Sequence, residues 1–139
     1  MTRLTHAEFH TAAPVARARA DRGRASYLSG LAAEDIVARD YARRGHPLRD
    51  SRWRGKRGEI DLVMEDGDGI VFVEVKKSRD FDAAMSRVTP AQVRRLYATG
   101  EEYLGGLPRG SLTDVRFDVA LVDSAGQVQV VENAFGHMF

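Results

Sequence analysis

The fold is decided by residues 58–79, which read GEIDLVMEDGDGIVFVEVKKSR. Two apolar runs flank the turn sequence DGDG at residues 66–69, a pattern typical of a β-hairpin. Side chains alternate across a strand, so each run has one face directed at a core. The residues expected on that core face are Ile60, Leu62, Met64, Val71, Val73 and Val75. With this face and this turn, the register is fixed and Glu65 lies opposite Ile70.

The same register brings charged side chains together on the other face of the hairpin. Asp61 is expected opposite Glu74, and Glu59 opposite Lys76. Two opposed carboxylates repel each other, so the pairing lowers stability unless a cation lies between them. A divalent cation such as Mg²⁺ would remove the conflict. A polar face with Glu59–Lys76 and arginine ion pairs is the alternative interpretation.

Two helices are expected on either side of the hairpin in the sequence. Residues 26–44 carry apolar side chains at about 100° spacing. Glu34 lies within that apolar stripe, where an unpaired charge is unfavourable. It is therefore expected either to pair with an arginine of the sheet or to point at a metal site. The second helix follows Thr89, an N-cap residue with which Gln92 completes a capping box.

The remaining segments complete an α/β pattern. Residues 47–54 predict an irregular first strand, and residues 81–88 a loop. The sequences VRFDVALV (115–122) and QVQVVENAF (127–135) predict two further strands joined by a tight turn. The order is helix, three strands, helix, two strands. We therefore expect an α/β fold with a central mixed β-sheet flanked by helices.

Composition places limits on the class of protein. The chain has 139 residues, enough for one domain. We expect a flexible N-terminal arm at residues 1–24, which lack sustained periodicity, and a single domain at residues 25–139. There is no cysteine, no secretion signal and no apolar run of membrane-spanning length, so we expect a cytoplasmic protein without a membrane partner.

Net charge is only +1, so binding of nucleic acid would require a local basic patch. Five basic residues lie among the nine positions of residues 49–57, together with Trp53. This segment is either a solvated edge strand or a rim that faces phosphates, with one aromatic side chain to stack. Of the 21 basic residues only three are lysines, a bias that reflects either genomic base composition or phosphate contact by arginine.

The combination of Asp61 with the sequence Glu74-Val75-Lys76 resembles the PD-(D/E)xK core of restriction-endonuclease-like nucleases. Five segments in order resemble the YraN-like family, a set of small bacterial proteins predicted to be endonucleases. These segments are GLAAEDIVARDYARRGHPL, WRGKRGEIDLVMEDGDGIVFVEVKK, VTPAQVRRL, RFDVALV and ENAF. They cover essentially everything but the arm.

The resemblance implies a restriction-endonuclease-like core and a metal-dependent nuclease. In such enzymes the positions of Asp61, Glu74 and the Val75 backbone carbonyl bind Mg²⁺ or Mn²⁺, and that of Lys76 is catalytic. Glu34 matches a first-helix glutamate that assists metal binding and belongs to the candidate catalytic set. The residues expected to contact nucleic acid are Arg52, Arg54, Lys56, Arg57, Lys77, Arg79, Gln92, Arg94 and Arg95.

The chain departs from the pattern at three positions. Ile60 stands where the superfamily has proline, Ser78 where the family often has arginine, and Gln92 where it often has lysine. These changes leave the metal ligands intact and alter the phosphate contacts around them.

Two functions from different classes follow. The first is hydrolysis of phosphodiester bonds in DNA, with branched and single-stranded DNA as candidate substrates. The alternative is a non-catalytic nucleic-acid-binding or assembly module, because fold alone does not determine function. A homodimer is compatible with a two-stranded substrate.

Overall fold

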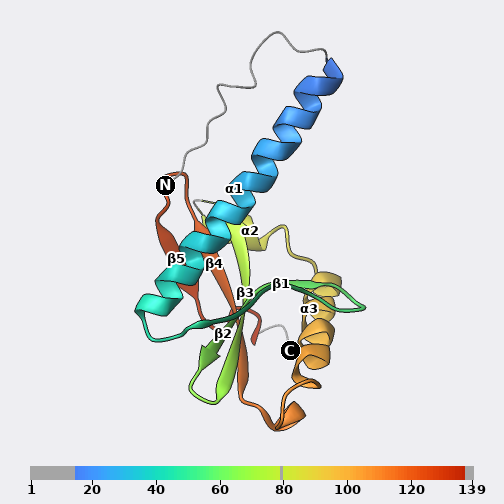
Figure 1. The fold of residues 1–139 in the computed structure, drawn as a ribbon, viewed down its shortest axis with the longest axis vertical. Helices are drawn as coiled ribbons and strands as arrows, with labels where there is room; N and C mark the ends of the chain where they lie inside the picture. Colours follow the sequence, from blue (N-terminus) through green and yellow to red (C-terminus); the bar gives the residue numbers. More distant parts are fainter. Residues whose placement is uncertain (1–14, 79, 137–139) are drawn as a thin grey trace. The chain divides into compact units, whose positions relative to one another are not determined.

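The computed structural model describes residues 15–78 and 80–136 and has an α/β fold with one five-stranded sheet (Figure 1). The helices are α1 (Val15–Arg43), α2 (Phe81–Met85), α3 (Pro90–Leu104) and the short 3-10 helix η2 (Gly110–Leu112). The strands are β1 (Leu48–Arg54), β2 (Glu59–Asp66), β3 (Gly69–Lys77), β4 (Val115–Val122) and β5 (Val128–Val131). The predicted fold class, a mixed sheet flanked by helices, is confirmed.

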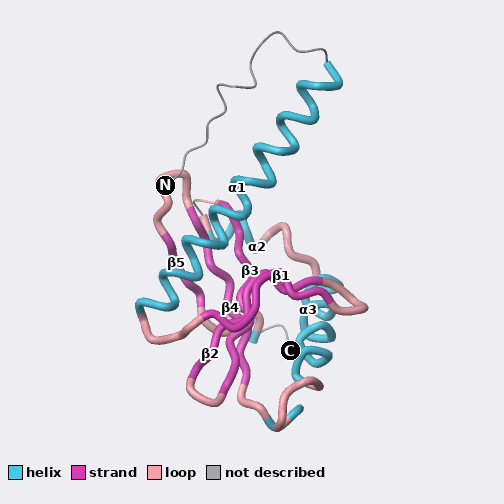
Figure 2. Tube along the Cα trace, in the orientation of Figure 1, coloured by secondary structure: helices cyan, strands magenta, loops and turns pink. Residues whose placement is uncertain are grey.

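The strands lie in the sheet in the order in which they occur in the chain (Figure 2). Strands β1, β2 and β3 form an antiparallel meander, β3 and β4 are parallel, and β5 is antiparallel to β4. The segment between β3 and β4, which contains α2 and α3, makes the crossover that a parallel pair requires. This topology agrees with a restriction-endonuclease-like core.

Two local predictions in the second half of the chain differ from the structure. Part of the expected loop at 81–88 is helix α2, whose N-cap Asp80 accepts a hydrogen bond from the backbone of Asp82 at 3.0 Å. The last strand is shorter than expected, because only Val128–Val131 of residues 127–135 pair with β4. By contrast, the capping box of Thr89 and Gln92 is present as predicted.

Helix α1 begins at Val15, well before the expected start at Ser26. Its first turns are rich in alanine and arginine, which favour helix without an apolar stripe. The chain divides into two compact units, residues 1–32 and residues 33–139, and the sheet belongs to the second. The arm predicted at residues 1–24 falls partly on residues 1–14, outside the described residues, and its separation from a domain at 25–139 stays a prediction.

Both faces of the sheet are buried by helices. On one face, Val37 and Tyr41 of α1 pack with the buried side chains Leu62, Met64, Val71, Val73, Ala120 and Val122. On the other, Val93 and Tyr103 of α3 pack with Ile60, Val63, Ile70, Phe72, Phe117 and Phe135. Gly100 lets α3 approach this second face closely, since a Cβ atom there would lie 2.8 Å from the Phe117 ring.

The hairpin register is confirmed, whereas its face assignment is partly wrong. Glu65 pairs with Ile70, Met64 with Val71 and Leu62 with Val73, as predicted. Ile60, however, packs on the α3 side and not with Leu62 and Met64.

We attribute this change of face to Arg52, which has a left-handed φ of 51° within β1. Strand alternation requires extended backbone at every residue, so one left-handed residue redirects its neighbours. Ser51 pairs with Leu62 and Trp53 with Ile60, which places Arg52 opposite Asp61 at the point where the faces switch. Trp53 accordingly packs edge-on against Tyr103 at 5.1 Å and is partly buried, and its stacking on nucleic acid stays a prediction.

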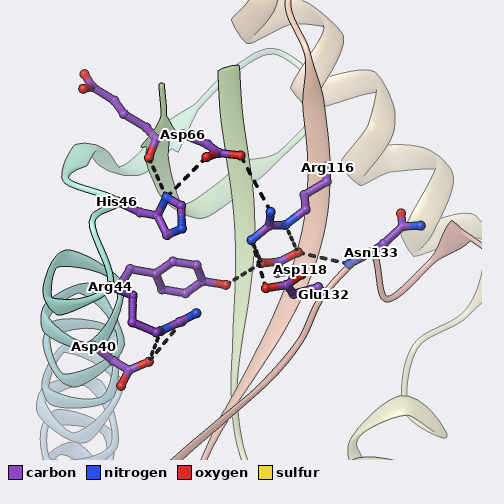
Figure 3. A network of polar contacts seen from close by, with 10 residues as sticks. Asp40, Arg44, His46, Asp66, Arg116, Asp118, Glu132 and Asn133 are labelled. Atoms are coloured by element: carbon purple, nitrogen blue, oxygen red, sulfur yellow. Dashed lines mark hydrogen bonds and ion pairs between the residues drawn. The ribbon is translucent and has the colours of Figure 1, made fainter. Parts of the chain in front are cut away.

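A buried carboxylate joins α1, β4 and the segment after β5 (Figure 3). Asp118 has no exposed surface. It accepts hydrogen bonds from the Tyr41 hydroxyl at 2.7 Å, from Arg116 Nε at 2.9 Å and from the Asn133 backbone at 3.1 Å. A buried charge needs such partners, because its desolvation is otherwise uncompensated. Asp118 is therefore a structural junction.

We predict that Asp118→Ala lowers the free energy of unfolding by about 3–5 kcal/mol, because it leaves Arg116 without its buried partner. Tyr41→Phe removes one hydrogen bond to the carboxylate and should lower it by about 1–2 kcal/mol. Asp35→Ala, which removes an exposed ion pair with Arg39, is the control and should change it by less than about 1 kcal/mol. Urea unfolding measures all three. Equal small effects from Asp118→Ala and Asp35→Ala would contradict the assignment.

Candidate active site

The main-chain ladder between β2 and β3 ends where the acidic residues begin. Its last pair is Leu62 with Val73. Beyond it, the Val75 backbone N–H donates to Asp61 Oδ2 at 2.8 Å, so a side chain replaces the main-chain acceptor. Strand β3 continues to pair with β4 as far as Lys77, while Glu59 and Ile60 stay paired with β1. The two strands thus carry their charged residues past the end of their shared ladder.

Glu74 and Asp61 are close neighbours, as the register predicts. The Glu74 side chain is only 22 % exposed, and its pKa is raised to about 8. Burial is the largest cause, followed by the negative charge of Asp61, and a hydrogen bond with Asp61 acts in the same direction. Lys76, whose Nζ lies 3.6 Å from Glu74 Oε2, opposes the shift.

Asp61 is subject to the same physical conflict. Burial raises the pKa of its carboxyl, and the Val75 N–H and the Lys76 charge counteract burial. Two adjacent desolvated carboxyl groups do not ionise together without a cation. At neutral pH the pair therefore retains a proton in the absence of metal. A divalent cation fits this donor set, because it would take the place of the proton and satisfy both charges.

The main chain of Val75 adds a donor of the required kind. The N–H and C=O of one strand residue point to the same side of the strand, and the Val75 N–H points at Asp61. Its carbonyl oxygen therefore also faces β2. Within residues 15–78 and 80–136, no three His, Asp or Glu side chains form a ready ligand set. Mg²⁺ commonly takes one or two carboxylates and keeps several waters, a coordination that Asp61, Glu74 and the Val75 carbonyl would match.

A cleft of about 180 Å³ opens beside Glu74. It lies between the charged ends of β2 and β3 and the first half of α3. Its lining comprises Gly58, Glu59, Glu74, Lys76, Val88, Gln92, Arg95, Leu96, Thr99 and Phe135. Asp61 is not part of this lining and contacts Glu74 from outside it. The cleft is polar around Glu74 and Lys76, and it is bordered by the basic side chain of Arg95.

Glu34 forms an ion pair with an arginine of the sheet, which is one of the two roles expected of it. Its carboxylate is 12 % exposed and accepts two hydrogen bonds from Arg52, at 3.0 Å and 3.2 Å. Burial raises the Glu34 pKa, Arg52 lowers it, and the charge of Asp61 raises it. The ion pair with a sheet arginine is thus confirmed. The interaction with Asp61 also places Glu34 in the electrostatic neighbourhood of the candidate site.

The ion pairs on the hairpin differ from the expected cross-strand pattern. Lys76 pairs with Glu74, its neighbour on the same strand, and Glu59 pairs with Arg54 of β1 at 3.4 Å. The structure gives no Glu59–Lys76 ion pair among the residues it describes. Lys76 therefore has its ammonium group beside the Asp61–Glu74 pair.

The turn between β1 and β2 is fastened to α3. Gly55 N–H donates to the Gly58 carbonyl at 2.9 Å, which closes the turn, and Lys56 N–H donates to Glu102 Oε1 at 2.9 Å. A Cβ atom on Gly58 would lie 3.2 Å from the Thr99 hydroxyl, so glycine allows close approach. Lys56 and Arg57 are consequently held on an exposed turn whose end, Gly58, borders the cleft.

The residues predicted to contact nucleic acid fall into three groups. Gln92 and Arg95 line the cleft, although Gln92 Oε1 also accepts from the Thr89 backbone. The exposed members outside the lining are Arg54, Lys56, Arg57, Lys77 and Arg94. Arg52 is directed at Glu34, and Arg79 lies outside the described residues.

Sequence reasoning did not identify Thr99, Glu102 or Phe135 as contributors to the site. Phe135 belongs to the ENAF segment, which was a signal without an assigned role. Glu102 is one acid among several in α3, and nothing in its local pattern distinguishes it. Its contact with Lys56 spans 46 residues.

The family model and the relatives of known sequence that match this chain carry the same family name. The model of "Uncharacterised protein family UPF0102" matches residues 33–122. A UPF0102 protein of Ruegeria pomeroyi is 54 % identical over 121 residues, 87 % of this chain and 98 % of the relative. One from Roseobacter denitrificans is 52 % identical over 124 residues, 89 % of this chain and 96 % of the relative. In the part of the chain that was described, no helix is long and apolar enough to cross a membrane.

We predict that Glu74→Gln stabilises the metal-free protein, increasingly so as pH rises. The pKa of Glu74 is 4.5 in the unfolded chain, whereas burial raises it to about 8 in the folded protein. The wild type therefore loses stability across this window, and glutamine does not. The advantage of the variant should reach the order of 1–3 kcal/mol at pH 8.5.

Urea unfolding in EDTA at pH 5, 7 and 8.5 measures this difference. Glu101→Gln, at an exposed position of α3, is the matched control and should show no such trend. A difference between Glu74→Gln and wild type that does not change with pH would contradict the burial argument.

Proposed function

The chain belongs to the uncharacterised protein family UPF0102, and for this member we propose a Mg²⁺- or Mn²⁺-dependent nuclease that hydrolyses phosphodiester bonds in DNA. This family is the one that the five sequence segments indicated. The observation that carries the proposal is the buried Asp61–Glu74 pair, with Lys76 3.6 Å from Glu74 at a polar cleft. Branched or single-stranded DNA is the proposed substrate.

The roles of the residues follow from their positions. Asp61, Glu74 and the Val75 carbonyl would hold the metal ion. When bound, such an ion supplies Lewis-acid polarisation of a phosphoryl oxygen and a water made nucleophilic at neutral pH. Lys76 extends into the cleft from the same face as Glu74, where its ammonium group donates hydrogen bonds to the attacking water and offsets negative charge on the phosphate.

The surroundings of the cleft suit a polyanion. Arg95 and Gln92 offer hydrogen-bond donors at the wall formed by α3, and the turn fastened by Glu102 presents Lys56 and Arg57. Arginine and lysine contacts to phosphates provide affinity without reading sequence. A cytoplasmic location and a homodimer on a two-stranded substrate remain part of this proposal.

Cleavage of DNA tests the proposal directly. Wild-type protein with Mg²⁺ or Mn²⁺ should cleave at least one member of a panel of single-stranded, duplex, flap and four-way DNAs. Glu74→Gln removes a metal ligand and Lys76→Ala removes the group that orients water. Each should lower the rate by at least about 100-fold. Arg109→Ala and Glu101→Gln, at exposed positions that do not line the cleft, are controls that should retain cleavage.

Binding without cleavage would favour the other function. If the wild type binds these DNAs, cleaves none with either metal, and binds as both variants do, the protein is a nucleic-acid-binding module. The same panel made of RNA separates the two nucleic acids as substrates.

The basic turn gives a second, independent prediction. In EDTA, the double variant Lys56→Ala/Arg57→Ala should bind DNA more weakly, and its log Kd should depend less steeply on log[salt]. Two lost phosphate contacts correspond to a slope smaller by about 1.4–1.8. Fluorescence anisotropy across a salt series measures the slope. Arg109→Ala, a basic residue that does not line the cleft, should leave it unchanged, and an unchanged slope in the double variant would remove this turn from the interface.

A further inference from the structure

Arg52, the residue of β1 with a left-handed φ, carries a positive charge whose role goes beyond the packing of the strand. We propose that Arg52 supplies a permanent positive charge to the acidic centre, by which we mean the cluster of acidic side chains around the candidate metal site. Arg52 holds Glu34 in an ion pair and thereby limits this centre to one divalent metal ion. This inference rests on the proposed metal-dependent function. It makes Arg52 a positioning residue, because the guanidinium acts through Glu34 and touches neither metal nor substrate.

The geometry of the pair supports this role. Arg52 Nε lies 3.0 Å from Glu34 Oε1, and Arg52 Nη2 lies 3.2 Å from Oε2. Both carboxylate oxygens are therefore engaged by one planar group, the bidentate arrangement that arginine forms best. The Glu34 side chain is 12 % exposed and that of Arg52 35 %, so water competes weakly for the contact. A cation approaching Glu34 would have to displace the guanidinium.

The position of Arg52 relates it to the candidate metal ligands. It is the β1 residue opposite Asp61, between the pairs Ser51–Leu62 and Trp53–Ile60. Its charge acts on Asp61 as well as on Glu34. One guanidinium thus offsets two acids that come from different elements, α1 and β2. Lys76 provides the corresponding charge on the side of Glu74.

The number of acidic residues in this centre determines how many metal ions it could bind, and the positive charge of Arg52 affects that number. The charges of Asp61 and Glu59 act on Glu34, that of Glu59 acts on Asp61, and that of Asp61 acts on Glu74. Centres with two metal ions hold the ions about 3.5–4 Å apart by sharing carboxylates. Here Asp61 and Glu74 would serve one ion, and Glu34 with Asp61 would be needed for a second. Arg52 occupies Glu34 and supplies positive charge at that place.

The backbone of Arg52 is consistent with selection for this contact. A φ of 51° is uncommon for a residue with a side chain of this size. Ser51 lies opposite Leu62, which packs on the α1 face, and Trp53 packs on the α3 face. The faces thus switch at Arg52, whose guanidinium bonds Glu34 of α1. Asparagine enters the left-handed region more readily than other non-glycine residues. Arg52→Asn is therefore a variant that keeps the backbone and removes the charge.

Titration with Mn²⁺ alone tests the inference without reference to cleavage. Calorimetry should give one Mn²⁺ per wild-type chain and two per Arg52→Asn chain, and electron paramagnetic resonance of the variant should show two coupled Mn²⁺ ions. The double variant Arg52→Asn/Glu34→Gln should return to one. Arg54→Asn, which removes an exposed arginine paired with Glu59, is the matched control and should bind one. One Mn²⁺ per Arg52→Asn chain at wild-type affinity overturns the proposal.

A second variant keeps the test decisive if Arg52→Asn does not fold. Since Glu34 is held by Arg52, Glu34→Gln should change the affinity of the single wild-type Mn²⁺ site by less than about threefold. A loss of tenfold or more would make Glu34 a metal ligand and overturn the proposal. The proposed function fails separately, and this inference with it, if wild-type protein binds no Mn²⁺ or if Asp61→Ala binds it as well as wild type.

Discussion

The hydrogen bond from the Val75 main chain to the Asp61 carboxylate is the contact around which the candidate site is organised. In an ordinary antiparallel pair, that N–H would be bonded to a main-chain carbonyl of β2. The substitution of a side chain for a carbonyl ends the ladder after Leu62 and Val73 and leaves the last residues of β3 supported by β4 alone. The cleft lies at this break, where the sheet presents the charged side chains of Glu59, Glu74 and Lys76.

The arrangement of acidic side chains in this centre lowers the stability of the folded protein locally. Glu74 and Asp61 lie partly buried next to each other, and each has its pKa raised chiefly by desolvation. Lys76 and Arg52 reduce the repulsion without abolishing it. Acidic groups whose pKa values are shifted by burial and by each other are common at functional centres. The surrounding sheet, buried on both faces, provides the stability that tolerates it.

Much of the fold could be predicted because its signals are local. The DGDG turn and the apolar alternation determined the β2–β3 register, and the Thr89 capping box located the start of α3. The side of the sheet on which Ile60 lies could not be predicted in this way. The switch of face lies opposite Arg52, a residue on another strand whose left-handed φ is not marked by a glycine or asparagine. The contact of Glu102 with the β1–β2 turn was missed for a similar reason, since its two partners are far apart in sequence.

The candidate site shows the same division. The proximity of Asp61, Glu74 and Lys76 followed from the register of the hairpin, which the paired residues Leu62 and Val73 fix directly beside them. The partner of Glu34 was foreseen only as an arginine of the sheet, because the identity of that arginine depends on how α1 lies over β1 within residues 33–139. In our proposal the ion pair with Arg52 takes the place of the metal-binding role expected of Glu34.

The buried junction at Asp118 has a consequence for how the protein unfolds. Its partner Tyr41 is 77 residues away in the sequence, and its contact with Asn133 requires the chain beyond β5 to be in place. Contacts that close such long loops form after local ones, so this junction belongs to the late side of the folding barrier. Interactions absent from the transition state slow unfolding and leave the folding rate nearly unchanged. The contacts of Asp118 would therefore slow unfolding and lengthen the lifetime of the native state. Slower unfolding would in turn lower the susceptibility of the protein to proteolysis.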